Sequence, residues 1–457
     1  MKKSSTDKPQ EKERSSLPKR ARRYASVSAQ AAQVGVRVAV ARAMGGKAHS
    51  PFEAALLRAA LGGLKGPLMK IAQLIAVIPD LLPREVAAEL ATLQADAPPM
   101  GWPFVRRRMA VELGAHWQSL FKSFEPMACA AASLGQVHKA TGKDGRALAC
   151  KLQYPDMGSV VEADLQQLKL LFGLFERFSG AVMTGEAFAE IAERLREELD
   201  YGREAQNMAL YGKILADVKD VHVPKAVPAL STSRLLTMTW MAGEKLTDEV
   251  IKARSQAERN KIAETLFRAW YKPFYTYGVI HGDPHLGNYT VRPDNSLNLL
   301  DFGCIRVFKP EFVQAIIMLY AALREDDEAE LVEAFRLWGF EKPSKALVAA
   351  LGHWARFVYA PFLEDRVTAM AETNATAAGR AVASQVYGEL KKIGGVSVPR
   401  PFVLMDRASV GLGGVFLRLG AEANWHTLFH EMTDGFDLKL LKQKQDSVLS
   451  PFTALRK

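Results

Sequence analysis

The feature that most constrains this chain is a short acidic segment, His281-Gly-Asp-Pro-His-Leu-Gly-Asn288, followed by Asp301-Phe-Gly303. Asp283, Asn288 and Asp301 have the order and spacing that phosphoryl transfer in a protein-kinase-like fold requires. In such a site the first acid faces the attacking hydroxyl or water, while the amide and the second acid hold Mg²⁺ ions beside the nucleotide phosphates. The segment therefore predicts an enzyme that uses a nucleotide.

The stretch between these two motifs predicts a strand, a turn and a second strand. Pro293-Asp294-Asn295 supplies the turn, and residues 289–292 and 296–300 supply the strands. A hairpin of this length would place both candidate metal ligands at one edge of a cleft. We therefore predict Asn288 and Asp301 as metal ligands and Asp283 as the catalytic carboxylate.

Length and composition are those of an ordinary globular protein. The 457 residues can bury a large core and should divide into two or three units. No uncharged apolar run approaches the ~18–20 residues that span a bilayer, and no secretory signal pattern is present. We expect no transmembrane helix, no secretion and a cytoplasmic location, with peripheral attachment to the inner membrane left open. Cys129, Cys150 and Cys304 lack metal-binding spacing, which favours reduced thiols.

The net charge of +10 is concentrated at the start of the chain. Residues 1–24 hold nine Lys or Arg against three acids, with almost no apolar side chains. This composition predicts a disordered basic tail. It suits docking on an anionic membrane surface, and a purely solubilising tail is the alternative. Nucleic-acid binding is not expected, because no basic face interleaved with aromatic residues follows.

The rest of the chain divides by its hydrophobic period into three parts. Residues 25–124 read as a helical extension, residues 125–243 as a mixed lobe, and residues 244–457 as a helical lobe that carries the acidic segment. Within the mixed lobe we expect strands at 135–139, 147–151 and 235–239 and helices at 160–178 and 186–204. This order predicts an α+β, bilobal protein-kinase-like fold.

Lys151 ends one of the short apolar strands, which is where a kinase holds the lysine that binds the nucleotide phosphates. Such a lysine needs a carboxylate to orient it. The predicted helix 186–204 places four acids on one face, and these are Glu193, Glu197, Asp200 and Glu204. Because like charges repel, at least one of them should meet a cation across the cleft. A solvated acidic face is the alternative interpretation.

Two further segments are unusual. Before the first expected strand, residues 128–137 form an alanine-rich loop where kinases ordinarily have glycines, and alanines restrict the approach of the backbone to phosphates. Residues 67–78 predict a helix that is apolar almost all round except for Lys70 and Gln73, which share one face. These two side chains either extend to solvent or point into a polar site.

Together these segments resemble the UbiB/AarF atypical kinase-like proteins. The matching segments are Lys70-Ile-Ala-Gln73, Ala130-Ala-Ala-Ser-Leu-Gly-Gln-Val137, Cys150-Lys-Leu-Gln-Tyr-Pro155, Glu198-Leu-Asp-Tyr-Gly-Arg-Glu204, His281 to Asn288 and Asp301-Phe-Gly303. The resemblance implies that Lys151 binds phosphate and that Glu204 is its ion-pair partner. For the acidic loop it implies the same roles that the spacing predicts.

The resemblance also implies an ATP site that is covered. The helix with Lys70 and Gln73 would lie over the cleft and exclude protein substrates, and Glu198 and Asp200 would receive the lysine. We assign the segment Ala131-Ala132-Ser133 to the nucleotide phosphates. We place the adenine edge near Met241.

The family behaves more like ATPases than protein kinases, associates with membranes and supports isoprenoid-quinone biosynthesis. The resemblance therefore implies ATP and Mg²⁺ as cofactors, with anionic membranes and quinone-pathway lipids or proteins as partners. Two alternatives stay open: a small-molecule phosphotransferase of the aminoglycoside or choline type, and a nucleotide-binding pseudokinase scaffold. The sequence does not indicate an oligomeric state.

Overall fold

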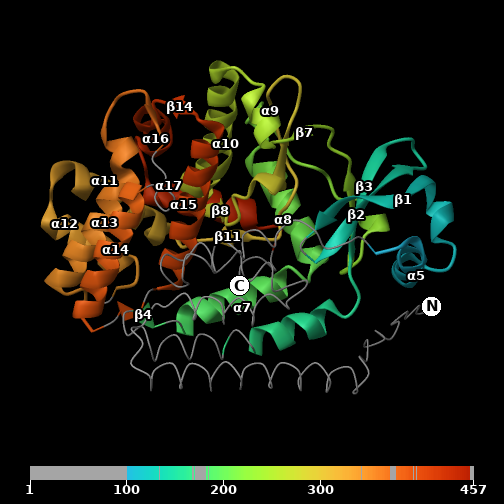
Figure 1. Ribbon diagram of the computed structural model, residues 1–457, viewed down its shortest axis with the longest axis horizontal. Coiled ribbons are helices and arrows are strands. Elements are labelled where there is room, and N and C mark those ends of the chain that lie inside the picture. The colour runs from blue at the N-terminus through green and yellow to red at the C-terminus, as the bar shows by residue number, and fades with distance from the viewer. Residues whose placement is uncertain are drawn as a thin grey trace, which may run out of the picture.

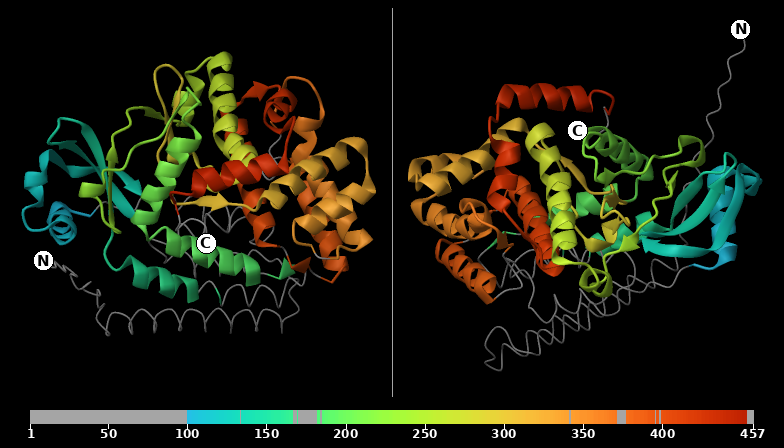
Figure 2. Two further views of the ribbon diagram at one scale, coloured as in Figure 1. Left: turned by 180° about the vertical axis from the view of Figure 1, so that it is seen from behind. Right: turned by 90° about the horizontal axis from the view of Figure 1, so that it is seen from above.

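The computed structural model describes residues 100–452 apart from 133, 167–168, 170–181, 184, 341, 371–376, 395 and 398. The basic tail, Ser133 and the predicted helix with Lys70 and Gln73 lie outside the described residues. Figure 1 shows a small sheet-containing lobe at one end and a helical lobe at the other, and Figure 2 shows the same separation from behind and from above. The predicted bilobal α+β fold is therefore confirmed for the described part of the chain.

The N-lobe is built on an antiparallel sheet with the strand order β1-β2-β3-β6. Its strands are β1 (Phe121–Ala132), β2 (Gly135–Gly142), β3 (Ala147–Gln153) and β6 (Leu235–Thr239). Helix α5 (Trp102–Leu113) and the 3-10 turn η1 (Trp117–Leu120) pack on the sheet through a core that includes Val105, Met109 and Trp117. The three expected strands are present, and β1 begins before residue 125, where we expected the lobe to start.

The alanine-rich segment is the end of a strand, which corrects the expectation of a loop. Ala130 pairs with Val137 and Ala132 pairs with Gly135, so only residues 133 and 134 separate β1 from β2. On its other side β2 packs closely against β3, which is possible because Gly135 has no side chain: a Cβ there would lie 2.3 Å from the Leu152 carbonyl oxygen of β3. The pairing of β1 with β2 therefore extends to the end of β1.

The single helix expected at 186–204 is two helices, α7 (Gly185–Glu197) and α8 (Tyr201–Ile214). Asp200 begins the second helix, because its carboxylate accepts hydrogen bonds from the backbone N–H groups of Gly202 and Arg203. This N-cap replaces the bonds that a continuous helix would make. The acids expected on one face are consequently divided between two helices.

The second lobe is mostly helical, as expected. Its helices are α9 (Asp248–Lys252), α10 (Gln256–Tyr277), α11 (Pro310–Glu325), α12 (Glu328–Leu337), α13 (Lys345–Leu363), α14 (Ala377–Lys392), α15 (Arg400–Leu419), α16 (Trp425–Thr433) and α17 (Leu438–Leu449). The short elements are β4 (Val182–Met183), β5 (Val221–His222), η2 (Pro228–Leu230), β7 (Glu244–Lys245), η3 (Leu286–Asn288), β12 (Thr368–Ala369), β13 (Val396–Ser397) and β14 (Glu422–Ala423).

Helix α10 packs in the core of the second lobe, and the chain that follows it leads directly into the site. It begins at a capping box of Ser255 and Glu258 and ends at Gly278, which adopts the left-handed conformation. The chain then enters β8 (Val279–His281), which pairs with β11 (Ile305–Val307). Between them lies the predicted hairpin, β9 (Tyr289–Val291) and β10 (Leu297–Leu299). The start of the first acidic motif therefore lies beside the residues that follow the second motif.

Among the described residues, helix α13 is long and apolar enough to cross a membrane by length and composition alone. Half of its most apolar stretch is buried inside the fold.

Candidate active site

Lys151 and Glu204 form a buried ion pair between the sheet and helix α8. The lysine Nζ lies 2.7 Å from Oε1 and 2.9 Å from Oε2 of the glutamate. Burial alone would lower the pKa of Lys151, but the carboxylates of Asp301 and Glu204 outweigh it and hold that pKa well above its ordinary value. Burial raises the pKa of Glu204, and the adjacent lysine opposes the rise. Lys151 is therefore charged in this pair.

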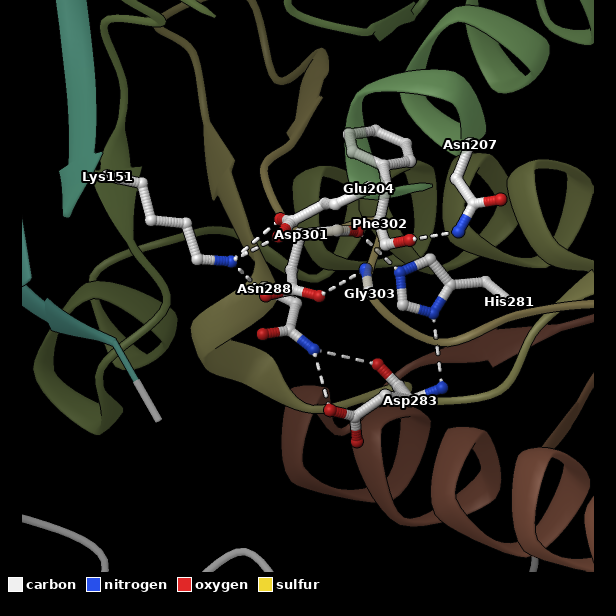
Figure 3. A network of polar contacts seen from close by, with 9 residues as sticks. All are labelled: Lys151, Glu204, Asn207, His281, Asp283, Asn288, Asp301, Phe302 and Gly303. Atoms are coloured by element: carbon white, nitrogen blue, oxygen red, sulfur yellow. Dashed lines mark hydrogen bonds and ion pairs between the residues drawn. The ribbon is translucent and has the colours of Figure 1, made fainter. Parts of the chain in front are cut away.

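The same ammonium also contacts Asp301 of the Asp-Phe-Gly motif. Its Nζ lies 3.2 Å from Oδ2, and Oδ1 accepts a hydrogen bond from the Gly303 backbone N–H at 2.9 Å. The Tyr201 ring lies beneath the ammonium, 5.2 Å from Nζ to the ring centroid. Figure 3 shows Lys151 between the two carboxylates. The phosphate-binding candidate and one metal-ligand candidate are thus in direct contact.

Asn288 and Asp283 form the other side of the site. The Asn288 side-chain amide donates to the Asp283 carbonyl oxygen at 2.9 Å and to Asp283 Oδ2 at 3.2 Å. Because the amide nitrogen is held there, its oxygen lies on the side of Asp301, as Figure 3 shows. Carboxylate and amide oxygens are the ligands that Mg²⁺ prefers. The residues present therefore fit a magnesium ion.

His281 joins the two acidic motifs, a role that sequence reasoning did not assign to it. Its Nε2 donates to the Asp301 carbonyl oxygen at 2.8 Å, and its Nδ1 accepts from the Asp283 backbone N–H at 3.1 Å. The side chain is 1% exposed. Since one ring nitrogen donates and the other accepts, the geometry selects the neutral Nε2–H tautomer. The only signal in the sequence was its place at the start of the motif.

Two further acids of the expected face, Glu193 and Glu197, are also paired with cations. The Glu197 carboxylate, at the end of α7, contacts Arg194 of its own helix, Arg203 of α8 at 2.8 Å and Arg306 of β11 at 2.5 Å. Glu193 lies 3.6 Å from Arg400. These contacts link the junction of α7 and α8 to the strand that follows the Asp-Phe-Gly motif.

Glu198 and Asp200, the acids implied to receive Lys70, lie in that junction. A Cβ at Gly303 would lie 3.5 Å from Glu198 Cγ, so the Glu198 side chain borders the metal-ligand loop. Asp200 is exposed, and one of its oxygens caps α8. Whether Lys70 meets either acid lies outside the described residues and stays a prediction.

The residues assigned to the nucleotide lie on the sheet and on the chain that links the lobes. Ala131 is exposed near the end of β1, and Ala132 is the last residue of that strand. Met241 follows β6, with its sulfur 4.0 Å from Thr239 Oγ1. The backbone N–H of Trp240, which lies between them, donates a hydrogen bond to the Ala147 carbonyl oxygen of β3. The structure therefore places Met241 where the chain leaves the N-lobe sheet.

A bilobal fold with a lysine–glutamate pair in the small lobe and an Asp…Asn…Asp set in the large lobe defines a protein-kinase-like protein. The ABC1 atypical kinase-like domain matches residues 92–335 of the chain. The chain belongs to the ABC1 atypical kinase-like family. This confirms the resemblance that the sequence motifs carry.

Individual relatives agree with this assignment. The Saccharomyces cerevisiae protein "Atypical kinase COQ8, mitochondrial" is 30% identical over 266 residues, which is 57% of this chain and 53% of the relative. The Caenorhabditis elegans protein "Atypical kinase coq-8, mitochondrial" is 30% identical over 289 residues, 62% of this chain and 38% of the relative. The chain thus spans about half or less of the length of these curated relatives.

A solved structure from Mycobacterium tuberculosis, determined as a complex with erythromycin, is similar over most of the chain. The TM-score is 0.58 at 26% sequence identity, and the alignment covers 84% of this chain and 96% of the other. The similarity extends well beyond the residues that match the family domain.

Proposed function

We propose that this protein binds ATP with Mg²⁺ between its lobes and transfers or hydrolyses the terminal phosphoryl group. One observation carries the proposal. Lys151 bridges Glu204 and Asp301, while Asn288 holds Asp283 on the other side of Asp301. These are the cation, the metal ligands and the nucleophile-facing acid that phosphoryl transfer needs, gathered at one point.

In this proposal each described residue has one task. Lys151 holds the α- and β-phosphates, below the hairpin of Ala131 and Ala132, and Met241 borders the adenine. Bound Mg²⁺ would neutralise charge on the phosphates, with oxygens of Asn288 and Asp301 as its protein ligands. Asp283, which is 8% exposed, orients the attacking water or hydroxyl. The rate enhancement would come from positioning and from charge neutralisation.

We propose that the lobes divide at residue 243, with α5 and η1 joined to the N-lobe because their side chains share its core. Two segments before these lobes have proposed roles of their own, residues 1–24 and the helix with Lys70 and Gln73. We propose that the basic tail docks on an anionic membrane surface. We further propose that the Lys70 helix covers the cleft and excludes protein substrates.

The biological setting we propose is isoprenoid-quinone or related lipid metabolism at a membrane. The support is family membership together with two relatives named as mitochondrial atypical kinases. Family membership does not favour a small-molecule phosphotransferase of the aminoglycoside or choline type.

The test is ATP turnover by the purified protein. We expect phosphate release that needs Mg²⁺, is abolished in Asp283→Asn and is unchanged in Asp144→Asn, an exposed acid in the β2–β3 turn. Asp283→Asn should still bind ATP, since the substitution removes no phosphate or metal contact in the proposal. Turnover that survives in Asp283→Asn would contradict the assignment of that residue.

Two additions separate the alternatives. Anionic liposomes and quinone-like phenols should each stimulate turnover if the protein works on lipids at a membrane. Nucleotide binding without turnover under any of these conditions would establish the pseudokinase scaffold instead. Phosphorylation of a soluble alcohol would establish the small-molecule enzyme.

A further inference from the structure

Helix α8 contacts the Asp-Phe-Gly motif through a second buried side chain, Asn207. This residue lies three positions after Glu204, on the same face of the helix. It is 2% exposed, and its Nδ2 donates to the Phe302 carbonyl oxygen at 2.7 Å. Figure 3 shows this bond above the ring of His281. Asn207 thus contacts the residue directly after Asp301.

The same helix also holds the other backbone group of Phe302. The Phe302 N–H faces the Glu204 carboxylate and favours its charged form, so α8 contacts both the N–H and the C=O side of one residue. The Phe302 side chain is fully buried, with its ring 5.7 Å from that of Tyr211, also on α8. The Phe302 backbone therefore cannot rotate without breaking the buried bond to Asn207 and moving its ring out of the core.

The two peptide groups that directly follow the Asp301 side chain are consequently both held by buried side chains. His281 binds the Asp301 carbonyl oxygen, and Asn207 binds the carbonyl of the next residue. The two bonds fix the backbone from which the Asp301 carboxylate projects. Lys151 contacts that carboxylate, but it also has Glu204 as a partner. If Asp301 moved, the lysine would still have Glu204 as a counter-ion. The contact with Lys151 therefore does not by itself hold Asp301 in place.

We propose that Asn207 is a positioning residue that holds Asp301 as a Mg²⁺ ligand and so couples helix α8 to the metal site. The inference rests on the proposed function, because Asp301 has to be a metal ligand. In Asn207→Asp the shape is kept, but an acceptor faces the Phe302 carbonyl oxygen. Asn207→Ala removes the bond and leaves a buried carbonyl without that donor, which costs stability as well.

The experiment measures binding of a fluorescent ADP analogue as Mg²⁺ is titrated, and repeats the binding in EDTA. For both Asn207 variants we expect the Mg²⁺ concentration at half-saturation to rise about threefold to tenfold, the equivalent of one lost hydrogen bond. Affinity in EDTA should stay within about twofold of wild type, because Lys151 and Glu204 are unchanged. Melting curves show that each variant is folded.

A matched control uses Gln445, whose side-chain amide also donates to backbone carbonyls, those of Tyr277 and Phe308 at 2.9 and 2.8 Å. Gln445→Glu should lower the melting temperature without changing the Mg²⁺ dependence. An unchanged Mg²⁺ half-saturation in both Asn207 variants, or an equal shift in Gln445→Glu, would overturn the inference while leaving the proposed function intact. Nucleotide binding by the wild type that ignores Mg²⁺ would overturn both.

Discussion

Lys151 and Asp301 are in contact, with Nζ 3.2 Å from Oδ2, although 150 positions separate them in the chain. The same ammonium also binds Glu204 at 2.7 Å. One cation therefore joins the N-lobe sheet, helix α8 and the metal-ligand loop. An arriving nucleotide would have to share this cation with two carboxylates, so the stability of the three-residue cluster and nucleotide binding are linked.

We expect the two partners of the ion pair to differ in their effect on stability. Lys151→Met leaves two carboxylates facing each other in a buried site, and removing one member of a buried pair typically costs about 3–5 kcal/mol. Glu204→Gln leaves Lys151 with Asp301, so its cost should be smaller. Urea unfolding of both variants checks the order. A double variant that loses the full sum of the two costs would show that the residues act independently.

We expect Tyr201→Phe to be nearly neutral for stability. The hydroxyl is buried and, among the described residues, has no hydrogen-bond partner, while the ring lies under the Lys151 ammonium. Removing an unpaired hydroxyl should change the free energy of unfolding by less than about 1 kcal/mol, in either direction. Tyr201→Leu should cost more, because the cation–π contact and ring packing are lost. Thermal melts of the two variants test this order. A large loss of stability in Tyr201→Phe would show that the hydroxyl has a hydrogen-bond partner.

We expect His138 to make stability fall as the pH drops. Burial lowers the pKa of His138 below its ordinary 6.5. Its Nδ1 donates to the Glu125 carbonyl, so its Nε2 accepts from the Gln136 amide, and a proton on Nε2 would face that donor. The unfolded chain binds the proton first, so this contribution is complete above about pH 6.5 and is lost as the pH falls toward the folded pKa.

The measurement for His138 is the free energy of unfolding between pH 8 and pH 5. His138→Gln should be less stable than wild type at pH 8, and its stability should fall less steeply below pH 6.5. Parallel curves for the two proteins would show that His138 does not titrate in this range.

Much of the site was predictable because its parts are local. Asp283 and Asn288 lie in one loop, and the turn chemistry around Asp294 brings Asp301 back beside them. Lys151 was predictable because it lies in a short apolar strand, which continues to Gln153 in the structure. The family resemblance rested on these same segments, and the family domain confirms it.

Other features depended on competition between local and distant bonds. Residues 186–204 have a continuous helical period, yet the chain breaks where the Asp200 side chain takes over two backbone N–H groups. The alanine-rich segment resembles a loop by composition, but its pairing with β2 makes it a strand. In the first case side-chain hydrogen bonds, and in the second strand pairing, decided the secondary structure that the sequence pattern did not fix.

The sequence by itself determined which chemical groups this protein can bring to a nucleotide: one strand-borne lysine, one helix-borne glutamate and an Asp…Asn…Asp set on a hairpin. Only the tertiary structure decided how they are held. Asn207 meets Phe302 across 95 positions, and His281 meets the Asp301 carbonyl through a register of paired strands. Such contacts produce no recognisable spacing pattern in the sequence, because a hydrogen bond between distant segments depends on how the whole core packs.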